Sequence, residues 1–258
     1  MDLKIKGKYF IVGGAGAGFG RAISEELAKE GANILAVSRT EEKLISLKKD
    51  YPENIEYLCS DITSERTQQE ILKWAEGKYL SGVLINAGGP PAGGFFEIEM
   101  DQWDQAWQTV VRWKIALTQK LIPLFLKQKY GRLLYIESVT LKQPIENLIL
   151  SNALRPAVLG FVKTLSQEVA AKGITANLLA PGSHATAALH RLFVKKSELE
   201  GITVQEAKKQ WEKSIPVGKM AGADEMAAIA LYLLSPLSRY MTGQTITHDG
   251  GTVKGIFG

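Results

Sequence analysis

The stretch Lys8-Tyr-Phe-Ile-Val-Gly-Gly-Ala-Gly-Ala-Gly-Phe-Gly20 decides how this chain folds. Its first six residues form a short apolar run, which is typical of a buried parallel strand. Glycine then recurs up to position 20, and Arg21–Glu30 carries apolar residues at helical spacing. A glycine-rich turn between a strand and a helix predicts a phosphate site, since the backbone can approach closely and the helix start offers free N–H groups. A connector without a ligand is the alternative reading of the glycines alone.

Further short apolar runs alternate with helical stretches along the chain, at residues 33–37, 55–59, 82–86, 132–137 and 174–178. This alternation predicts an α/β fold of the Rossmann type, a doubly wound parallel sheet in a three-layer α/β/α arrangement. The chain has 258 residues with 45% hydrophobic content, which suffices for one core. We therefore expect a single domain over residues 1–258.

Six motifs resemble, in their order, those of the short-chain dehydrogenase/reductase family, from about residue 5 to residue 252. They are the glycines 13, 14, 18 and 20, with Gly13 in place of a threonine; Asp61; Asn86-Ala87-Gly88; Pro181-Gly182 with Thr186; Thr242-Gly243-Gln244; and Asp249-Gly250-Gly251. The motif order resembles 3-oxoacyl-carrier-protein reductases in particular. The resemblance implies a bound nicotinamide dinucleotide held by Gly14, Gly16, Gly18, Phe19, Gly20, Ser38, Arg39, Asp61, Ile62, Asn86, Ala87, Gly88, Arg155, Pro181, Gly182 and Thr186.

The end of the second strand bears on the choice of cofactor. An acidic residue there would accept the ribose hydroxyls of NAD, but this chain carries Ser38 and Arg39. A hydroxyl beside a guanidinium suits the 2′-phosphate of NADP, because arginine donates in a planar fork. We expect NADP(H), while NAD(H) stays open if Arg39 lies over the adenine or points into solvent.

Proton transfer in the family uses a tyrosine, a lysine four residues on, a serine thirteen residues before the tyrosine, and an asparagine on the preceding helix. Counted from both sides, the tyrosine position is Ser151 and the lysine position is Arg155, whereas Ser138 retains the serine. The asparagine position falls on Val110. The chain has no tyrosine between Tyr135 and Tyr232, so a shifted alignment does not restore one.

This replacement weakens the expected chemistry, because an aliphatic hydroxyl is a much poorer acid than a phenol and serine is shorter. Arg155 keeps a positive charge with a different donor geometry. Pro156 disfavours helical geometry at Arg155, so we expect the helix to begin near Pro156 after an irregular lead-in that displaces Arg155. The alternative is a plain helix start capped by Ser151 or Asn152.

Other residues offer substitute acids. Lys142 follows the fifth strand on the edge where ligands bind, and His184 lies near the expected nicotinamide position. Glu137 is the weaker candidate, since neighbours along a strand face opposite sides of the sheet and Ser138 would face the site. His190 and His248 have no partner in sequence, and no Cys/His spacing indicates zinc, so we expect no metal.

The segment 186–214 reads as a helical lid over an apolar substrate, or as a helix pair that packs on the core or on a neighbouring subunit. The helix that carries Trp103, Trp107 and Trp113 packs against a second subunit in the family, which implies a homotetramer or homodimer. The net charge of +4 gives no argument for nucleic acid, and no apolar run is long enough for a membrane. The one cysteine, Cys59, is expected in a buried strand; with no signal peptide it indicates the cytoplasm.

Two functions follow. One is an NADP(H)-dependent oxidoreductase that interconverts a carbonyl and an alcohol on a small, apolar substrate, with an altered set of catalytic residues (Val110, Ser138, Ser151 and Arg155). The other is a protein that binds the cofactor without turnover, as a sensor or a partner subunit.

Overall fold

The computed structural model describes residues 2–256; positions 1, 257 and 258 of the expected domain lie outside the described residues. Seven strands form one parallel sheet in the order β3-β2-β1-β4-β5-β6-β7. Their bounds are β1 Tyr9–Gly13, β2 Asn33–Ser38, β3 Ile55–Cys59, β4 Leu80–Ile85, β5 Gly131–Ile136, β6 Ile174–Pro181 and β7 Thr245–His248. The doubly wound parallel sheet expected from the alternation is confirmed.

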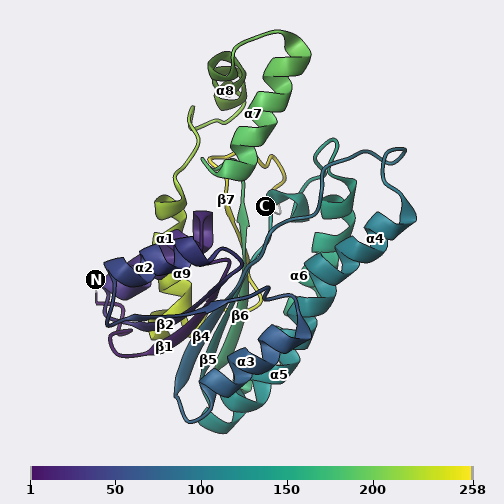
Figure 1. Ribbon diagram of the computed structural model, residues 1–258. Helices are drawn as coiled ribbons and strands as arrows, with labels where there is room; N and C mark the ends of the chain where they lie inside the picture. Colours follow the sequence, from purple (N-terminus) through teal and green to yellow (C-terminus); the bar gives the residue numbers. More distant parts are fainter. Residues whose placement is uncertain (1, 257–258) are drawn as a thin grey trace.

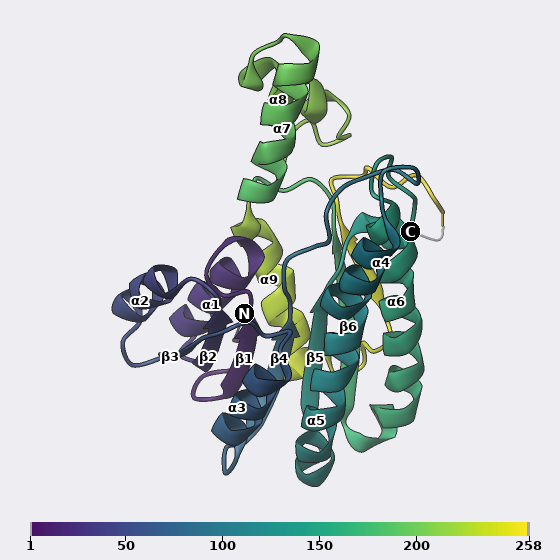
Figure 2. The same ribbon diagram turned by 45° about the vertical axis from the view of Figure 1, so that its right-hand side comes forward.

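Helices cover both faces of the sheet (Figures 1 and 2). On one face lie α1 Gly18–Lys29, α2 Glu41–Asp50 and α9 Ala223–Leu234; on the other lie α3 Glu65–Ala75, α5 Trp113–Gln128 and α6 Ile149–Val169. Each face has its own apolar core, the first around Ile23, Leu27 and Met226 and the second around Leu117 and Val158. Burial of these side chains on both faces fixes the register of the central strands.

The strand order reverses between β1 and β4, which are neighbours although β2 and β3 separate them in the chain. In parallel α/β sheets, such a reversal opens a crevice outside the carboxyl ends of the two strands. Gly13 ends β1 and Asn86 follows β4, so the glycine-rich turn and the Asn86 turn meet there.

A long helical segment is interrupted at its middle. It begins with α4 Met100–Ala106, where Glu99 and Gln102 form a capping box, continues through the π-helical turn Trp107–Arg112, and becomes α5. Val110 lies in this turn and is buried. Turns of this kind are frequent at functional sites.

Two helices, α7 Ala187–Glu200 and α8 Val204–Lys213, extend from the carboxyl edge of the sheet (Figure 1). Thr186 caps α7, and Thr203 with Glu206 forms the capping box of α8. The rings of Phe193 and Trp211 meet edge to face between the two helices. The segment 186–214 is therefore a helix pair that stands away from the sheet. No helix within residues 2–256 is long and apolar enough to cross a bilayer.

Two expectations about local structure are wrong. Cys59 is exposed, because β3 is the edge strand of the sheet and its end is covered on neither side. Helix α6 begins at Ile149, so Pro156 lies inside it and Arg155 is not displaced. Leu150, Val158 and Val162 are fully buried along this helix, and that packing outweighs the local bias of proline.

Candidate functional site

A cavity of about 480 Å³ lies outside the carboxyl ends of β1, β2 and β4. Its walls are the glycine-rich turn, the end of β2, the turn after β3 and the loop after β4. Eight of the predicted cofactor residues line it, namely Gly14, Gly16, Ser38, Arg39, Asp61, Ile62, Ala87 and Gly88. Gly18, Phe19 and Gly20 open α1 beside it, and Pro181, Gly182 and Thr186 lie at the base of α7. The structure thus gathers residues from distant parts of the sequence around one crevice.

The glycines of this turn are required by close backbone approach. A Cβ on Gly14 would lie 2.6 Å from Asn86 Nδ2, and Gly14 has a φ of +67°. A Cβ on Gly16 would lie 2.5 Å from Ser38 Oγ. Asn86 Nδ2 donates to the Gly13 carbonyl at 3.1 Å, which ties the β4 turn to the glycine turn. The glycine turn can therefore pack against Asn86 and Ser38 only while positions 14 and 16 carry no side chain.

Two cations stand at the end of β2 and the start of α2. Arg39 Nη1 lies 3.9 Å from Asp61 Oδ2, and the Arg39 side chain is 76% exposed, so this pairing is loose. Lys43 also lines the cavity. The sequence expectation did not include Lys43; its position one helical turn after Arg39 was the available signal.

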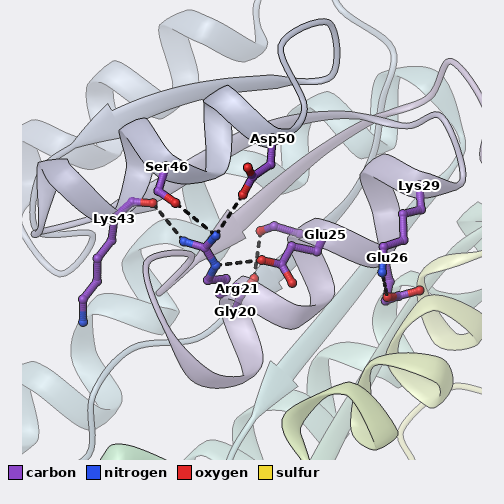
Figure 3. Close-up of polar contacts among 9 residues, drawn as sticks. Gly20, Arg21, Glu25, Glu26, Lys29, Lys43, Ser46 and Asp50 are labelled. Carbon is purple, nitrogen blue, oxygen red and sulfur yellow. Dashed lines mark hydrogen bonds and ion pairs between the residues drawn. The ribbon is translucent and has the colours of Figure 1, made fainter.

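A network around Arg21 joins α1 to α2 and so holds Lys43 in place (Figure 3). Arg21 Nε donates to Glu25 at 2.7 Å, Nη1 donates to the Lys43 carbonyl at 3.2 Å, and Nη2 pairs with Asp50 at 3.3 Å. The start of α2 is thereby fixed against the helix that follows the glycine turn. The network thus fixes the backbone that carries Lys43 at the rim of the cavity.

Two buried charges and one part-buried charge form a cluster behind the end of β5. Glu137 has a fully buried carboxylate; its Oε1 accepts a hydrogen bond from Lys114 Nζ, and its Oε2 pairs with Arg155 Nη1 at 2.9 Å. Burial lowers the pKa of Lys114, against the Glu137 carboxylate, which raises it. We call Lys114, Glu137 and Arg155 the buried charge triad. It holds two cations and one anion.

Arg155 is the triad member that reaches toward the cavity. A Cβ on Gly89 would lie 2.9 Å from Arg155 Nη2, so the guanidinium abuts the loop that follows the Asn86 turn. Its Nε is buried and has no hydrogen-bond partner among the described residues. One edge of the guanidinium is thus held by Glu137, while the buried Nε has no protein partner among the described residues.

Ser151 and Arg155 share one face of α6, one turn apart, as the expected spacing requires. Ser151 is buried at 8% exposure. Ser138 Oγ accepts the Thr140 N–H at 3.2 Å and caps the 3₁₀ turn Val139–Leu141, which Lys142 follows. Tyr135 does not replace the missing phenol, because it is fully buried, exchanges a hydrogen bond with Thr118, and burial raises its pKa.

His184 lies in a pair with His248 rather than in the main cavity. His184 Nε2 is 2.8 Å from His248 Nδ1, and His184 Nδ1 is 3.2 Å from the Gly182 carbonyl. A carbonyl only accepts, so Nδ1 of His184 carries a proton and Nε2 accepts from His248. Burial lowers the pKa of His184, and the Gly182 carbonyl opposes that shift. The ring also meets the edge of Phe19 at 4.9 Å.

Comparison with known proteins identifies the family. Residues 14–253 match the family model described as enoyl-(acyl carrier protein) reductase. The chain is 30% identical over 250 residues to dehydrogenase/reductase SDR family member 6 of Rattus norvegicus, covering 96% of this chain and 98% of the relative. The chain belongs to the short-chain dehydrogenase/reductase family.

Two further similarities lie within this family. The NADPH-dependent reductase BacG of Bacillus subtilis is 30% identical over 255 residues, covering 95% of this chain and 98% of that protein. The crystal structure of a variant of actinorhodin polyketide ketoreductase with NADPH superposes with a TM-score of 0.90 at 25% identity, covering 96% of this chain and 98% of that chain. The chain thus matches dehydrogenase/reductase proteins over nearly its whole length.

Sequence reasoning missed Lys114, and it missed the contacts of Glu137, His184 and His248 that only the fold creates. Lys114 and Glu137 are 23 positions apart, and His184 and His248 are 64 apart. The sequence predicted that Glu137 and Ser138 face opposite sides of the sheet. Helix α6 places Arg155 on the side of Glu137. An acidic residue directly after a buried strand was the signal that marked Glu137.

Proposed function

We propose that this chain is an NADP(H)-dependent oxidoreductase that interconverts a carbonyl and an alcohol on a small, apolar substrate. The observation that carries the proposal is the cradle made by Gly14 and Gly16, which line the cavity with backbone alone and have no room for a Cβ. The N–H groups at the start of α1 stand beside it to receive a pyrophosphate. When bound, the nicotinamide group supplies or accepts the hydride.

NADP(H) is favoured over NAD(H) by the charges at the rim. Ser38, Arg39 and Lys43 stand together where a 2′-phosphate would lie, and the loose contact with Asp61 leaves Arg39 free to turn toward it. Related proteins are described as NADPH-dependent or were solved with NADPH. NAD(H) binding is the outcome if Arg39 and Lys43 do not contact the phosphate.

Arg155 takes the place of the family lysine at the nicotinamide ribose. Glu137 orients its guanidinium through Nη1, and the unpartnered Nε and the Nη2 beside Gly89 provide donors for ribose hydroxyls. The altered set is then Val110, Ser138, Ser151 and Arg155. Val110 contributes no polar group, although Thr109 of the same turn lines the cavity.

The proton reaches the substrate oxygen through Ser138 and Ser151 from solvent, since neither hydroxyl is acidic enough to act alone. Lys142 and His184 are the alternative donors; His184 would have to give up its contact with His248 before its Nε2 could carry a proton to the substrate. The segment 186–214 acts as a lid over the apolar substrate. Trp107, 41% exposed, marks the face of a homodimer or homotetramer, and the single cysteine suits the cytoplasm.

A second candidate function is cofactor binding without turnover, as a sensor or partner subunit. The observation that favours it is Ser151 at the tyrosine position, in a site where Arg155 is already engaged by Glu137. Both functions use the same nucleotide site. They differ in whether that site has a group that can transfer a proton to the substrate.

Consumption of NADPH with a panel of aliphatic and aromatic ketones, at substrate saturation, separates the two. An oxidoreductase gives turnover with at least one ketone, and Ser151→Tyr raises it because a phenol restores an acid. Arg155→Met, which removes the ribose donors but keeps the length of the chain, is the matched negative control. If NADPH binds but neither the wild type nor Ser151→Tyr turns over any ketone, the sensor function stands instead.

A further inference from the structure

A second cavity, of about 290 Å³, lies at the amino ends of β5 and β6, at the opposite end of the sheet from the glycine turn. Its walls come from the link between α5 and β5, the link into β6, and the turn after the short helix Pro236–Ser238. Because β5 spans about 20 Å at 3.3 Å per residue, this cavity is separate from the nucleotide crevice. We call it the basal cavity.

The basal cavity is lined by three cations and by no carboxylate. Lys129 and Arg239 stand at its exposed rim, and Arg132 lies inside it. Within residues 2–256, none of these three side chains takes part in an ion pair. Three uncompensated charges around one concave surface concentrate anions there.

Arg132 is a buried guanidinium without a counter-ion. It is 3% exposed, and its Nε and Nη1 donate to carbonyls of Ser235, Gly131 and Gly173 at 2.9–3.1 Å. It also stacks on the ring of Tyr130, 4.3 Å from the centroid. These neutral partners accept from Nε and Nη1 but leave the charge uncompensated, which is an unusual state for a buried ion.

Two hydroxyls in the same cavity lack partners. Among the described residues, neither the buried Oγ1 of Thr175, a residue that is 4% exposed, nor the buried Oη of Tyr130 has a hydrogen-bond partner. Both residues line the basal cavity. Hydroxyl donors beside guanidinium and ammonium groups are the partners that phosphate oxygens take, whereas a cation or an apolar ligand would leave them unmet.

We propose that the basal cavity binds a tetrahedral oxyanion, either inorganic phosphate or the phosphate group of a small phosphomonoester. Arg132 supplies the buried charge, Lys129 and Arg239 close the rim, and the hydroxyls of Thr175 and Tyr130 donate to the remaining oxygens. The site stands apart from the proposed nucleotide site and does not depend on it.

Thermal unfolding of the full chain with added phosphate tests the site. The background is Arg39→Ala with Lys43→Ala, which removes the cations of the nucleotide cavity, and sodium chloride holds the ionic strength constant. We expect a saturable rise in unfolding temperature with inorganic phosphate or with glycerol 3-phosphate. Added Lys129→Ala and Arg239→Ala should weaken the apparent affinity at least tenfold, and Thr175→Val should weaken it less.

Lys127→Ala is the matched control, because Lys127 lies two residues from Lys129 on the exposed surface of α5 and does not line the cavity. It should leave the phosphate response unchanged. A response to the monoester alone would identify a metabolite as the source. Equal responses in the background chain and in the chain with Lys129→Ala and Arg239→Ala, or no saturable response, would overturn the proposal.

Discussion

The nucleotide crevice and the buried charge triad lie at the same edge of the sheet but are built by opposite means. The crevice depends on side chains that are absent, since Gly14 and Gly16 touch Asn86 and Ser38 through bare backbone. The triad depends on side chains that are present, with Glu137 fully buried between two cations. The crevice should therefore be sensitive to an added side-chain atom at these glycines. The triad should be sensitive to the loss of any one of its charged partners.

The triad should show the larger effect when it is broken. Glu137→Gln leaves Lys114 and Arg155 as buried cations without a counter-ion, so we expect a loss of about 3–5 kcal/mol in the free energy of unfolding. Denaturant titration measures it. Glu70→Gln is the control, because Glu70 pairs with Arg66 on the surface at 3.0 Å, and that change should cost less than about 1 kcal/mol. Equal losses would mean that the triad is not a buried charge cluster.

The crevice can be broken by one methyl group. Gly16→Ala places a Cβ 2.5 Å from Ser38 Oγ, so we expect a loss of about 1–3 kcal/mol in stability together with weakened NADPH binding. The control is Gly160→Ala in α6, where an added Cβ meets nothing within 4 Å and should stabilise the helix by about 0.5–1 kcal/mol. If Gly16→Ala bound NADPH with unchanged affinity, the proposal that NADPH binds against this glycine turn would be contradicted.

Much of the crevice is predictable from sequence and little of the triad is. The glycine turn is local, because its strand, turn and helix are consecutive in the sequence. The short apolar runs predicted the strands of the sheet. The triad joins β5, α5 and α6, and its partners become neighbours only through packing. The prediction that α6 begins at Pro156 failed for the same reason. The burial of Leu150 and Val158 keeps this stretch helical, and the local preference of a residue before proline does not reveal that packing. Exposed Cys59 reflects the edge position of β3, which strand composition does not reveal.

The rim of the crevice gives a more selective effect. Arg39→Ala removes a charged donor from the 2′-phosphate, worth about 1.5–3 kcal/mol, so NADPH affinity should fall by about tenfold to a hundredfold. NADH affinity should stay as it is, since NADH lacks that phosphate. Isothermal titration with both nucleotides on both proteins measures the split. A parallel fall for NADH would place Arg39 on the adenine instead.

The smallest effect concerns pH. Because burial lowers the pKa of His184 in the folded chain, the unfolded chain binds its proton first as pH falls below about 6.5. The contribution of His184 to stability is therefore complete above that pH and declines below it. His184→Asn, which keeps a donor for the Gly182 carbonyl, should flatten this dependence in unfolding curves from pH 7.5 to 5. His190→Asn, at an exposed position, should leave the pH dependence of stability unchanged. If both variants showed the same slope of stability against pH, His184 would be excluded as the source of that slope.

The most direct test of the central claim is the shift in unfolding temperature with NADPH, NADP, NADH and NAD, each over a concentration series. A ligand at a hundred times its dissociation constant stabilises a fold by about 2.7 kcal/mol, which is a readily measured shift. We predict that NADPH and NADP raise the unfolding temperature at concentrations where NADH and NAD do not. No shift with any of the four would contradict both the oxidoreductase and the cofactor-binding function.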